Sequence, residues 1–388
     1  MKVGSYQITY CTNVHPGETL DDLHRILATE VESVKAIVAP DTAMGAGLRL
    51  GNTVVRQLTD APEALARLAR LCEEQEYEVF TANGFPYGDF AAEVIKSDVY
   101  KPAWHFEDRV RYTSELARVL AALPGPKERT ISTVAGGFLP DTSDDATKTL
   151  VARNLKRTAE DFARIADETG VQIRLCLEPE PWTTLETTDD VLRFFDDFLP
   201  SGAPHVREHL GICYDCCHQA VHFEDPGTSI KRLVDADITI GKVQVSSALH
   251  LDDPADPRRR EALLRFAEPR FLHQVVARRG DDLLRCLDLA TLDQPTAEFL
   301  EADAWRCHFH VPIWWEGDGV LKTTKSDWEG VVSAIQDIGI KPHFEIETYT
   351  WHVLPDADRS DMESGDLTAS VVAEYTALIS ALGYGNSR

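Results

Sequence analysis

Three apolar segments, far apart in this chain, each end in a carboxylate. The segments are Ile173–Pro179 (IRLCLEP), Leu210–Asp215 (LGICYD) and His343–Thr348 (HFEIET), and they carry Glu178, Asp215 and Glu347 near their carboxyl ends. Short apolar runs bounded by polar residues are typical of buried strands. A carboxylate there is costly unless a cation or hydrogen-bond donors meet it. Parallel α/β barrels carry their chemistry at this end of their strands.

Strand-like and helix-like patterns alternate along most of the 388 residues. The predicted strands cover residues 3–11, 47–50, 78–82, 130–134, 172–178, 210–215, 240–246 and 342–348. The predicted helices cover residues 19–38, 62–74, 106–123, 144–169, 188–198, 227–236, 328–338 and 367–382. This alternation predicts an α/β fold with one (β/α)8 barrel over residues 1–388 and no separate domains.

Residues 249–313 interrupt the alternation between the seventh and eighth predicted strands. This stretch is longer than an ordinary connection between strand and helix. It contains a charged helix at 257–267, an alternating run at 271–277, a helical piece at 281–289 and a strand-like run at 305–312 that could pair with 271–277. We therefore expect an inserted subdomain at the mouth of the barrel.

Charge restricts the partners of the chain. It has 64 acidic and 39 basic residues, a formal net charge of −25, whereas binding to phosphate groups requires a basic surface. We expect a small-molecule metabolite as partner and no nucleic acid, while an oligomer stays open. No apolar run approaches the ~20 residues that span a bilayer, and the start MKVGSYQITY is not a secretory signal. These features favour a cytoplasmic protein with eight reduced cysteines.

Four residues form the strongest candidate site: Glu178, Asp215, His218 and Glu347. Divalent cations such as Mg²⁺ prefer carboxylate oxygens, and an imidazole extends the choice to Mn²⁺, Co²⁺ or Zn²⁺. We therefore predict a divalent metal (Mn, Mg, Co or Zn) at the carboxyl ends of the strands. The alternative is that each carboxylate only caps the helix that follows it.

Further polar and aromatic residues are candidates for the same site. Gln244 in KVQVS could coordinate through its amide oxygen or be a hydrogen-bonded residue of the barrel interior. His308 and His310 alternate in CHFHV and share one strand face, where we favour a metal role for His310. The alternative is that one of the two is buried and satisfied by a backbone carbonyl, and for His308 the choice stays open. Substrate contacts are predicted for Asn83, Glu180, His308 and Trp182, although Asn83 could equally belong to a plain turn and Trp182 to packing.

Other recognisable sites are absent from the sequence. It contains no GxGxxG, P-loop, GxSxG or HExxH motif, which disfavours nucleotide binding and serine esterase activity. Cys213, Cys216, Cys217 and His218 lack the second ligand pair of a structural zinc site. Glu180 and Glu345 each lie two residues from a predicted metal ligand, so one member of each pair could lie deeper or act as acid or base.

Three short motifs carry a resemblance to a known family. LEP at 177–179, YDCCH at 214–218 and IET at 346–348 resemble the xylose isomerase-like barrels of the sugar phosphate isomerase/epimerase superfamily. Over nearly its whole length the chain is also similar to the EboE family of metabolite traffic proteins. This second similarity is carried by GLRL (47–50), NGFPYG (83–88), LEPEP (177–181), YDCCH, LHQVV (272–276) and HFHVP (308–312).

The resemblance implies a TIM barrel that holds a divalent metal through Glu178, Asp215 and Glu347. In the isomerases a histidine from strand seven completes the ligand set. Gln244 occupies the matching position here, and His310 could substitute. His218 would match a histidine that contacts the substrate or supports a metal ligand.

The implied reaction is isomerisation or epimerisation of a small polyol or related metabolite through an enediolate, with Glu178, Glu347 and His218 as catalytic residues. Two alternatives stay open. One is a barrel that binds and hands over a metabolite without turnover, and the other is a metal-dependent hydrolase.

Overall fold

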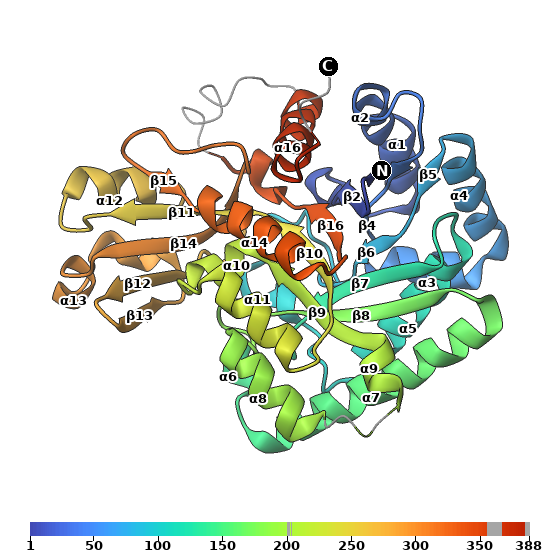
Figure 1. Ribbon diagram of the computed structural model, residues 1–388, viewed down its shortest axis with the longest axis horizontal. Coiled ribbons are helices and arrows are strands. Elements are labelled where there is room, and N and C mark those ends of the chain that lie inside the picture. Colours follow the sequence, from blue (N-terminus) through green and yellow to red (C-terminus); the bar gives the residue numbers. More distant parts are fainter. Residues whose placement is uncertain (200–201, 203, 355–366, 385–388) are drawn as a thin grey trace.

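Eight parallel strands form a closed sheet in sequence order (Figure 1). They are β2 (Tyr6–Tyr10), β4 (Leu48–Arg49), β6 (Thr81–Asn83), β7 (Glu128–Val134), β8 (Gln172–Glu178), β9 (Leu210–Asp215), β10 (Ile240–Val245) and β16 (His343–Ile346). The ring closes where Cys11 bridges Gly47 and the Thr12 amide donates to the Gly47 carbonyl at 2.8 Å. The predicted α/β barrel is confirmed. The computed structural model describes residues 1–199, 202, 204–354 and 367–384.

Further short strands lie next to this ring, two of them in a separate two-stranded sheet. The strand β1 (Lys2–Val3) pairs antiparallel with β2, and β3 (Met44–Gly45) pairs with β5 (Tyr77–Glu78). The helices around the barrel are α1 (Leu20–Ala28), α2 (Glu30–Val38), α3 (Asn52–Asp60), α4 (Pro62–Glu74), α5 (Glu107–Ala122), α6 (Leu139–Thr142), α7 (Asp145–Thr169), α8 (Thr188–Phe198), α9 (Pro204–His209), α10 (Cys216–Val221), α11 (Pro226–Asp235), α14 (Lys325–Ile338) and α16 (Leu367–Ala381). No helix within the described ranges is long and apolar enough to cross a membrane.

Local sequence explains where helices begin and end. The Thr19 side chain accepts from the Asp22 amide in a capping box, which satisfies free donors at the start of α1. The single helix predicted over 19–38 is wrong. It is divided into α1 and α2 because the backbone of Thr29 leaves helical geometry (φ −126°, ψ −66°). The predicted end of α7 is confirmed at Gly170, which has φ 70°, a conformation that favours glycine.

A second, antiparallel sheet lies beside the barrel mouth (Figure 1). Its order is β13 (Asp282–Cys286), β12 (Val275–Arg279), β14 (Ala304–Val311), β11 (Ser247–Asp252) and β15 (Lys322–Thr323), with α12 (Pro257–Leu264) and α13 (Ala297–Leu300) in its connections. It therefore extends beyond the predicted bounds 249–313 on both sides.

The predicted pairing within this sheet is present, because β12 pairs with β14 with Val275 opposite Cys307. The helix predicted over 281–289 is wrong. Residues Asp282–Cys286 instead form β13, which a turn at Gly280 (φ 59°) joins to β12. This hairpin gives the backbone of 282–286 its hydrogen-bond partners in the sheet.

Candidate metal centre and active site

The carboxylates of Glu178, Asp215 and Glu347 come together at the mouth of the barrel. Their ligand oxygens lie within 4.8 Å of one another, and all three side chains are buried. Glu178 and Asp215 are the last residues of β8 and β9, and Glu347 directly follows β16. Since neighbouring parallel strands end at the same edge, the strand pairing itself brings these groups together.

Hydrogen bonds fix one oxygen of two of these carboxylates. Asp215 Oδ1 accepts from Ser246 Oγ at 2.8 Å and from the His218 amide at 2.9 Å. Asp215 thus also caps α10, as the alternative interpretation expected, but with only one of its oxygens. Glu347 Oε1 accepts from the Nδ2 atoms of Asn13 and Asn83, both at 2.8 Å.

The remaining oxygens suit a cation. Among the described residues, Asp215 Oδ2 and Glu178 Oε2 have no hydrogen-bond partner. Burial, and then the neighbouring carboxylates, raise the pKa values of Glu178 and Glu347 well above their ordinary range. Buried carboxylates without donors are costly unless they are protonated or bound to a cation. The residues present therefore fit a divalent metal.

His310 adds a nitrogen to this cluster from the second sheet. Its Nδ1 donates to the Glu347 carbonyl oxygen at 2.7 Å, so Nε2 carries the lone pair of the neutral ring. That Nε2 has no partner among the described residues and lies 3.9 Å from Asp215 Oδ2. Burial lowers the pKa of His310, which favours the neutral form that binds metals. Two acceptors facing each other in a buried space again fit a cation.

Gln244 lies beside this cluster on β10. Strand pairing places it opposite Asp215 on one side and Glu345 on the other. It is fully buried, and neither its amide oxygen nor its amide nitrogen has a partner in the described ranges. The structure thus offers no hydrogen bond for the barrel-interior alternative, while an amide oxygen can serve as a metal ligand.

An ion pair that the sequence did not predict lies deeper in the barrel. Lys242 Nζ lies 2.6 Å from Glu345 Oε2, and both side chains have no exposed area. Glu345 is therefore the deeper member of its carboxylate pair. The positive charge of Lys242 partly offsets the rise in the pKa values of Glu178 and Glu347.

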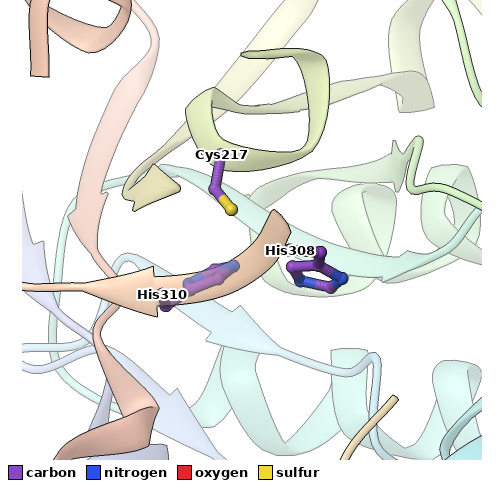
Figure 2. Close-up of side chains that lie close together, drawn as sticks. All are labelled: Cys217, His308 and His310. Atoms are coloured by element: carbon purple, nitrogen blue, oxygen red, sulfur yellow. The ribbon is translucent and has the colours of Figure 1, made fainter. Parts of the chain in front are cut away.

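His218 and His308 face each other beside the carboxylates. Their Nε2 atoms are 3.1 Å apart, and His218 Nδ1 lies 3.1 Å from the Pro179 carbonyl oxygen. Figure 2 shows His308 and His310 on the same strand, with Cys217 reaching toward them from α10. Burial raises the pKa of Cys217 well above its ordinary value, which keeps it a thiol. The alternative of a buried histidine satisfied by a backbone carbonyl describes His310, whose Nδ1 donates to the Glu347 carbonyl. It does not describe His308, whose Nδ1 faces the side chain of Gln274 at 2.7 Å.

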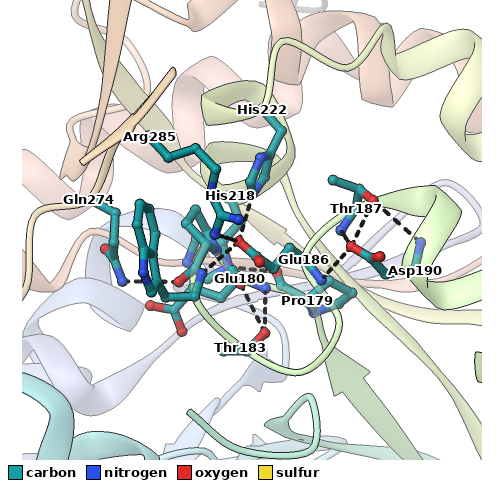
Figure 3. A network of polar contacts seen from close by, with 12 residues as sticks. Pro179, Glu180, Thr183, Glu186, Thr187, Asp190, His218, His222, Gln274 and Arg285 are labelled. Atoms are coloured by element: carbon teal, nitrogen blue, oxygen red, sulfur yellow. Dashed lines mark hydrogen bonds and ion pairs between the residues drawn. The ribbon is translucent and has the colours of Figure 1, made fainter. Parts of the chain in front are cut away.

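Glu180 belongs to a polar network in the loop between β8 and α8 (Figure 3). Its Oε1 accepts from Tyr100 at 2.7 Å, and burial raises its pKa to about 8. The same loop holds Trp182, whose φ of 66° is unusual for a large residue. The guanidinium of Arg285 lies 4.1 Å from the Trp182 ring. Trp182 is not among the described residues that line the cavity, so its predicted substrate contact has no support in the structure.

A pocket opens onto the cluster. Glu178, Glu180, Glu347, Asn83, His218 and His308 line its polar part. Phe90, Phe271 and Tyr349 line its outer part, with ring centroids 5.0–5.4 Å apart. Of the described residues that line this pocket, Lys96 is the one with a permanent positive charge. Its Nζ lies 2.7 Å from Asp288 Oδ2.

Sequence reasoning missed several residues of the site. Asn13 and Ser246 follow the first and seventh strands of the barrel. A polar residue just after a strand is the signal that selected Asn83, and the same signal could have identified Asn13 and Ser246. Tyr100 and Gln274 carry no comparable signal, because a loop and the second sheet bring them to Glu180 and His308.

Comparisons with known proteins agree with this architecture. The sequence profile of the family described as "Xylose isomerase-like TIM barrel" matches residues 47–364. A xylose isomerase-like TIM barrel protein from Mycobacterium smegmatis in complex with magnesium is 11% identical, with a TM-score of 0.54 over 98% of this chain and 99% of that chain. No curated protein matches the chain.

Two further solved structures share the fold. L-ribulose 3-epimerase is 13% identical, with a TM-score of 0.52 over 98% of this chain and 95% of that chain. The probable 3-DHS dehydratase AsbF from Bacillus anthracis is 13% identical, with a TM-score of 0.50 over 96% of this chain and 98% of that chain. At these identities the similarity establishes the fold alone.

Proposed function

Because this chain belongs to the xylose isomerase-like TIM barrel family, we propose that it is a divalent-metal-dependent isomerase or epimerase acting on a small polyol or sugar-like metabolite. The observation that carries the proposal is the convergence of Glu178, Asp215 and Glu347, with oxygens left without donors. An epimerase and a magnesium-bound protein among the structures of the same fold are consistent with it.

The metal ligands in this proposal are Glu178, Asp215, Glu347 and His310, with the Gln244 oxygen completing the set. Carboxylates, an amide and one imidazole suit Mg²⁺, Mn²⁺, Co²⁺ or Zn²⁺. When bound, such an ion polarises a carbonyl group and stabilises negative charge on its oxygen. Ser246, Asn13 and Asn83 hold the ligand carboxylates in orientation through the hydrogen bonds that they donate.

The proton transfers fall to the glutamates. One of Glu178 and Glu347 removes the proton from the carbon beside the substrate carbonyl, which leaves an enediolate. A carboxyl group then returns a proton, either to the opposite face of the same carbon or to the neighbouring carbon. The first outcome is epimerisation and the second isomerisation.

The lining of the cavity favours an uncharged substrate. Lys96 is already bound by Asp288 and by the Phe271 carbonyl oxygen at 2.7 Å, so it is not available for a phosphate group. Asn83, His218 and Glu180 can hydrogen-bond hydroxyl groups. The rings of Phe90, Phe271 and Tyr349 can pack against the apolar face of a ligand.

We also propose membership of the EboE family of metabolite traffic proteins, which rests on the stretches NGFPYG, LEPEP, YDCCH and HFHVP. That family is linked to a gene cluster implicated in exporting a precursor metabolite, so this narrower assignment makes the substrate a metabolite of that cluster.

Hydrogen exchange in D2O tests the proposed reaction. With the metal-loaded protein, candidate ketoses should incorporate deuterium at the carbon beside their carbonyl group. Glu178→Gln and Glu347→Gln should each lower the rate of this exchange by a factor of about 10² or more. Glu374→Gln is the matched control, because Glu374 is buried outside the cluster. Metal binding without exchange on any candidate ketose would favour a binding protein, and unchanged exchange in both variants would contradict the proposed roles.

A further inference from the structure

The short sequence HVREH, at residues 205–209, places two histidines four positions apart with a glutamate beside the second. It lies within α9 (Pro204–His209). Successive residues of a helix turn by about 100°, so His205, Glu208 and His209 share one side of α9. Two histidines at this spacing on one helix face are an arrangement that binds zinc in proteins.

The helix α9 lies at the end of the barrel opposite the carboxylate cluster. It runs directly into Leu210, the first residue of β9, whereas Asp215 is the last residue of that strand. The strand between them spans about 16 Å. Figure 1 shows α9 beside the long helix α7. A ligand bound by α9 is therefore separate from the proposed metal centre.

The ring of His209 is held in one orientation. It is 1% exposed and packs edge-on against Phe162 of α7, with ring centroids 6.4 Å apart. Its Nδ1 lies 2.7 Å from the carbonyl oxygen of Ile173 on β8. A carbonyl oxygen only accepts hydrogen bonds, so Nδ1 donates and Nε2 of the neutral ring carries the lone pair. Histidines that donate Nδ1 to a carbonyl and present Nε2 are the usual arrangement of metal ligands.

The groups around His209 Nε2 are acceptors. Glu208 Oε2 lies 4.0 Å from it, and no donor in the described part of the chain hydrogen-bonds to it. The ring centroid of His205 lies 6.4 Å from that of His209. One ligand atom of each of the three residues lies within 4.8 Å of the other two. Ligand atoms on a tetrahedral zinc ion are about 3.4 Å apart, a separation that the more exposed side chains of Glu208 and His205 can reach by rotation.

The backbone that carries these side chains is anchored on its other sides. Arg174 Nη1 donates to the carbonyl oxygens of Arg207 and Leu210, at 2.8 and 2.9 Å. The side chain of Arg207 forms an ion pair with Asp237 at 2.9 Å, and Val206 is buried. An ion that binds to a fixed helix orders few further groups, which lowers the cost of binding.

We propose that His205, Glu208 and His209 bind Zn²⁺ at the amino end of the barrel, as a site separate from the carboxylate cluster at its mouth. Two imidazoles and one carboxylate, with water in the fourth position, suit Zn²⁺. The three side chains come together only when α9 is formed, so the ion binds the folded chain and stabilises it. The contact of His209 with Ile173 links the ion to β8.

Equilibrium dialysis tests the site in solution. Full-length protein is stripped with a chelator and dialysed against the free Zn²⁺ concentration that just saturates the wild type, and bound zinc is measured by elemental analysis. His205→Gln and Glu208→Gln should each hold one zinc ion per chain fewer than the wild type. Circular dichroism checks that both variants fold.

His24→Gln is the matched control and should lose no zinc. His24 also lies on a helix, α1, with its Nδ1 2.8 Å from a carbonyl oxygen, that of Leu20. It belongs to none of the groups of potential metal ligands among the described residues. Equal zinc content in the wild type, His205→Gln and Glu208→Gln would overturn the proposed site.

Anomalous diffraction at the zinc edge locates the ion. A peak within coordination distance of His205 and His209 should appear in the wild type and in Asp215→Asn, which disrupts the proposed centre at the mouth, and should be absent from His205→Gln. Wild-type crystals at saturating Zn²⁺ without a peak at α9 would overturn the site and leave the centre at the mouth untouched. Loss of the α9 peak in Asp215→Asn would overturn the independence of the two sites.

Discussion

Lys242 Nζ lies 2.6 Å from Glu345 Oε2, and neither side chain has any exposed area. The pair lies deeper in the barrel than the carboxylate cluster, since Lys242 precedes Gln244 by two residues on β10 and Glu345 precedes Glu347 by two residues at β16. Its cation opposes the repulsion among Glu178, Glu347 and Asp215. The barrel interior thus supplies a fixed positive charge near the proposed metal centre.

Removing Lys242 should leave Glu345 buried without a counter-charge. We expect Lys242→Met to lower the free energy of unfolding of the metal-free protein by about 3–5 kcal/mol, as measured by denaturant titration. The double variant Lys242→Met/Glu345→Leu should regain most of this loss, because it removes the uncompensated charge. An equal loss in the single and double variants would show that packing, and not charge, stabilises this region.

The stability of the metal-free protein should fall as the pH rises from 6.5 to 8.5. Burial raises the pKa of Glu180 from its ordinary 4.5 to about 8. The folded protein therefore binds a proton there that the unfolded chain has lost, and this advantage disappears as the pH passes the folded pKa. The pKa of His218 is lowered to about 4, so its contribution grows only up to about pH 6.5 and is constant above it.

Two variants separate the sources of this pH dependence. Glu180→Gln should reduce the fall in unfolding free energy, while Glu178 and Glu347, whose pKa values are also raised, keep part of it in the metal-free protein. Added Zn²⁺ should reduce the fall in the wild type, because a bound cation replaces protons on the carboxylates. Glu374 also has a pKa raised to about 8 by burial, but it lies outside the site. Glu374→Gln should therefore reduce the slope equally with and without Zn²⁺. A metal-free wild type with constant stability over this range would contradict the raised pKa of Glu180.

Gln244→Leu should have opposite effects on stability and on metal binding. The substitution removes two buried polar atoms without partners in the described part of the chain, so the metal-free protein should gain about 1–3 kcal/mol. Metal affinity should fall about tenfold or more, because one ligand is lost. Gln172→Leu, at the amino end of β8, is the control and should keep the wild-type affinity. Unchanged metal affinity in Gln244→Leu would remove Gln244 from the ligand set.

Neutral sugars should be preferred over their phosphates. Lys96 is already bound by Asp288, and the outer cavity is aromatic, so a phosphate group would enter without a counter-charge. Deuterium exchange, compared between ketoses and the corresponding ketose phosphates, should be faster for the uncharged member of each pair. Faster exchange of the phosphates would contradict this substrate class.

The sequence predicted the barrel and the meeting of the three carboxylates because both depend on local patterns. Parallel strands end at one edge, so a carboxylate at each of three strand ends must come close to the others. The role of Glu178, Asp215 and Glu347 as metal ligands stays a prediction.

Relations that depend on long-range pairing were not predictable. Residues Asp282–Cys286 fit a helix or a strand locally, and only pairing with β12 decides for the strand. Lys242 in an apolar strand gives no sign of its partner 103 residues later. The contact of His308 with His218 depends on the second sheet, whose position no local pattern encodes.

Anomalous diffraction from crystals loaded with Mn²⁺ tests the central claim most directly. The account predicts a peak within coordination distance of the carboxylates of Glu178, Asp215 and Glu347 in the wild type, and its loss in Asp215→Asn. A wild-type map without a peak at this position, after loading at saturating Mn²⁺, would contradict the metal centre and with it the proposed reaction.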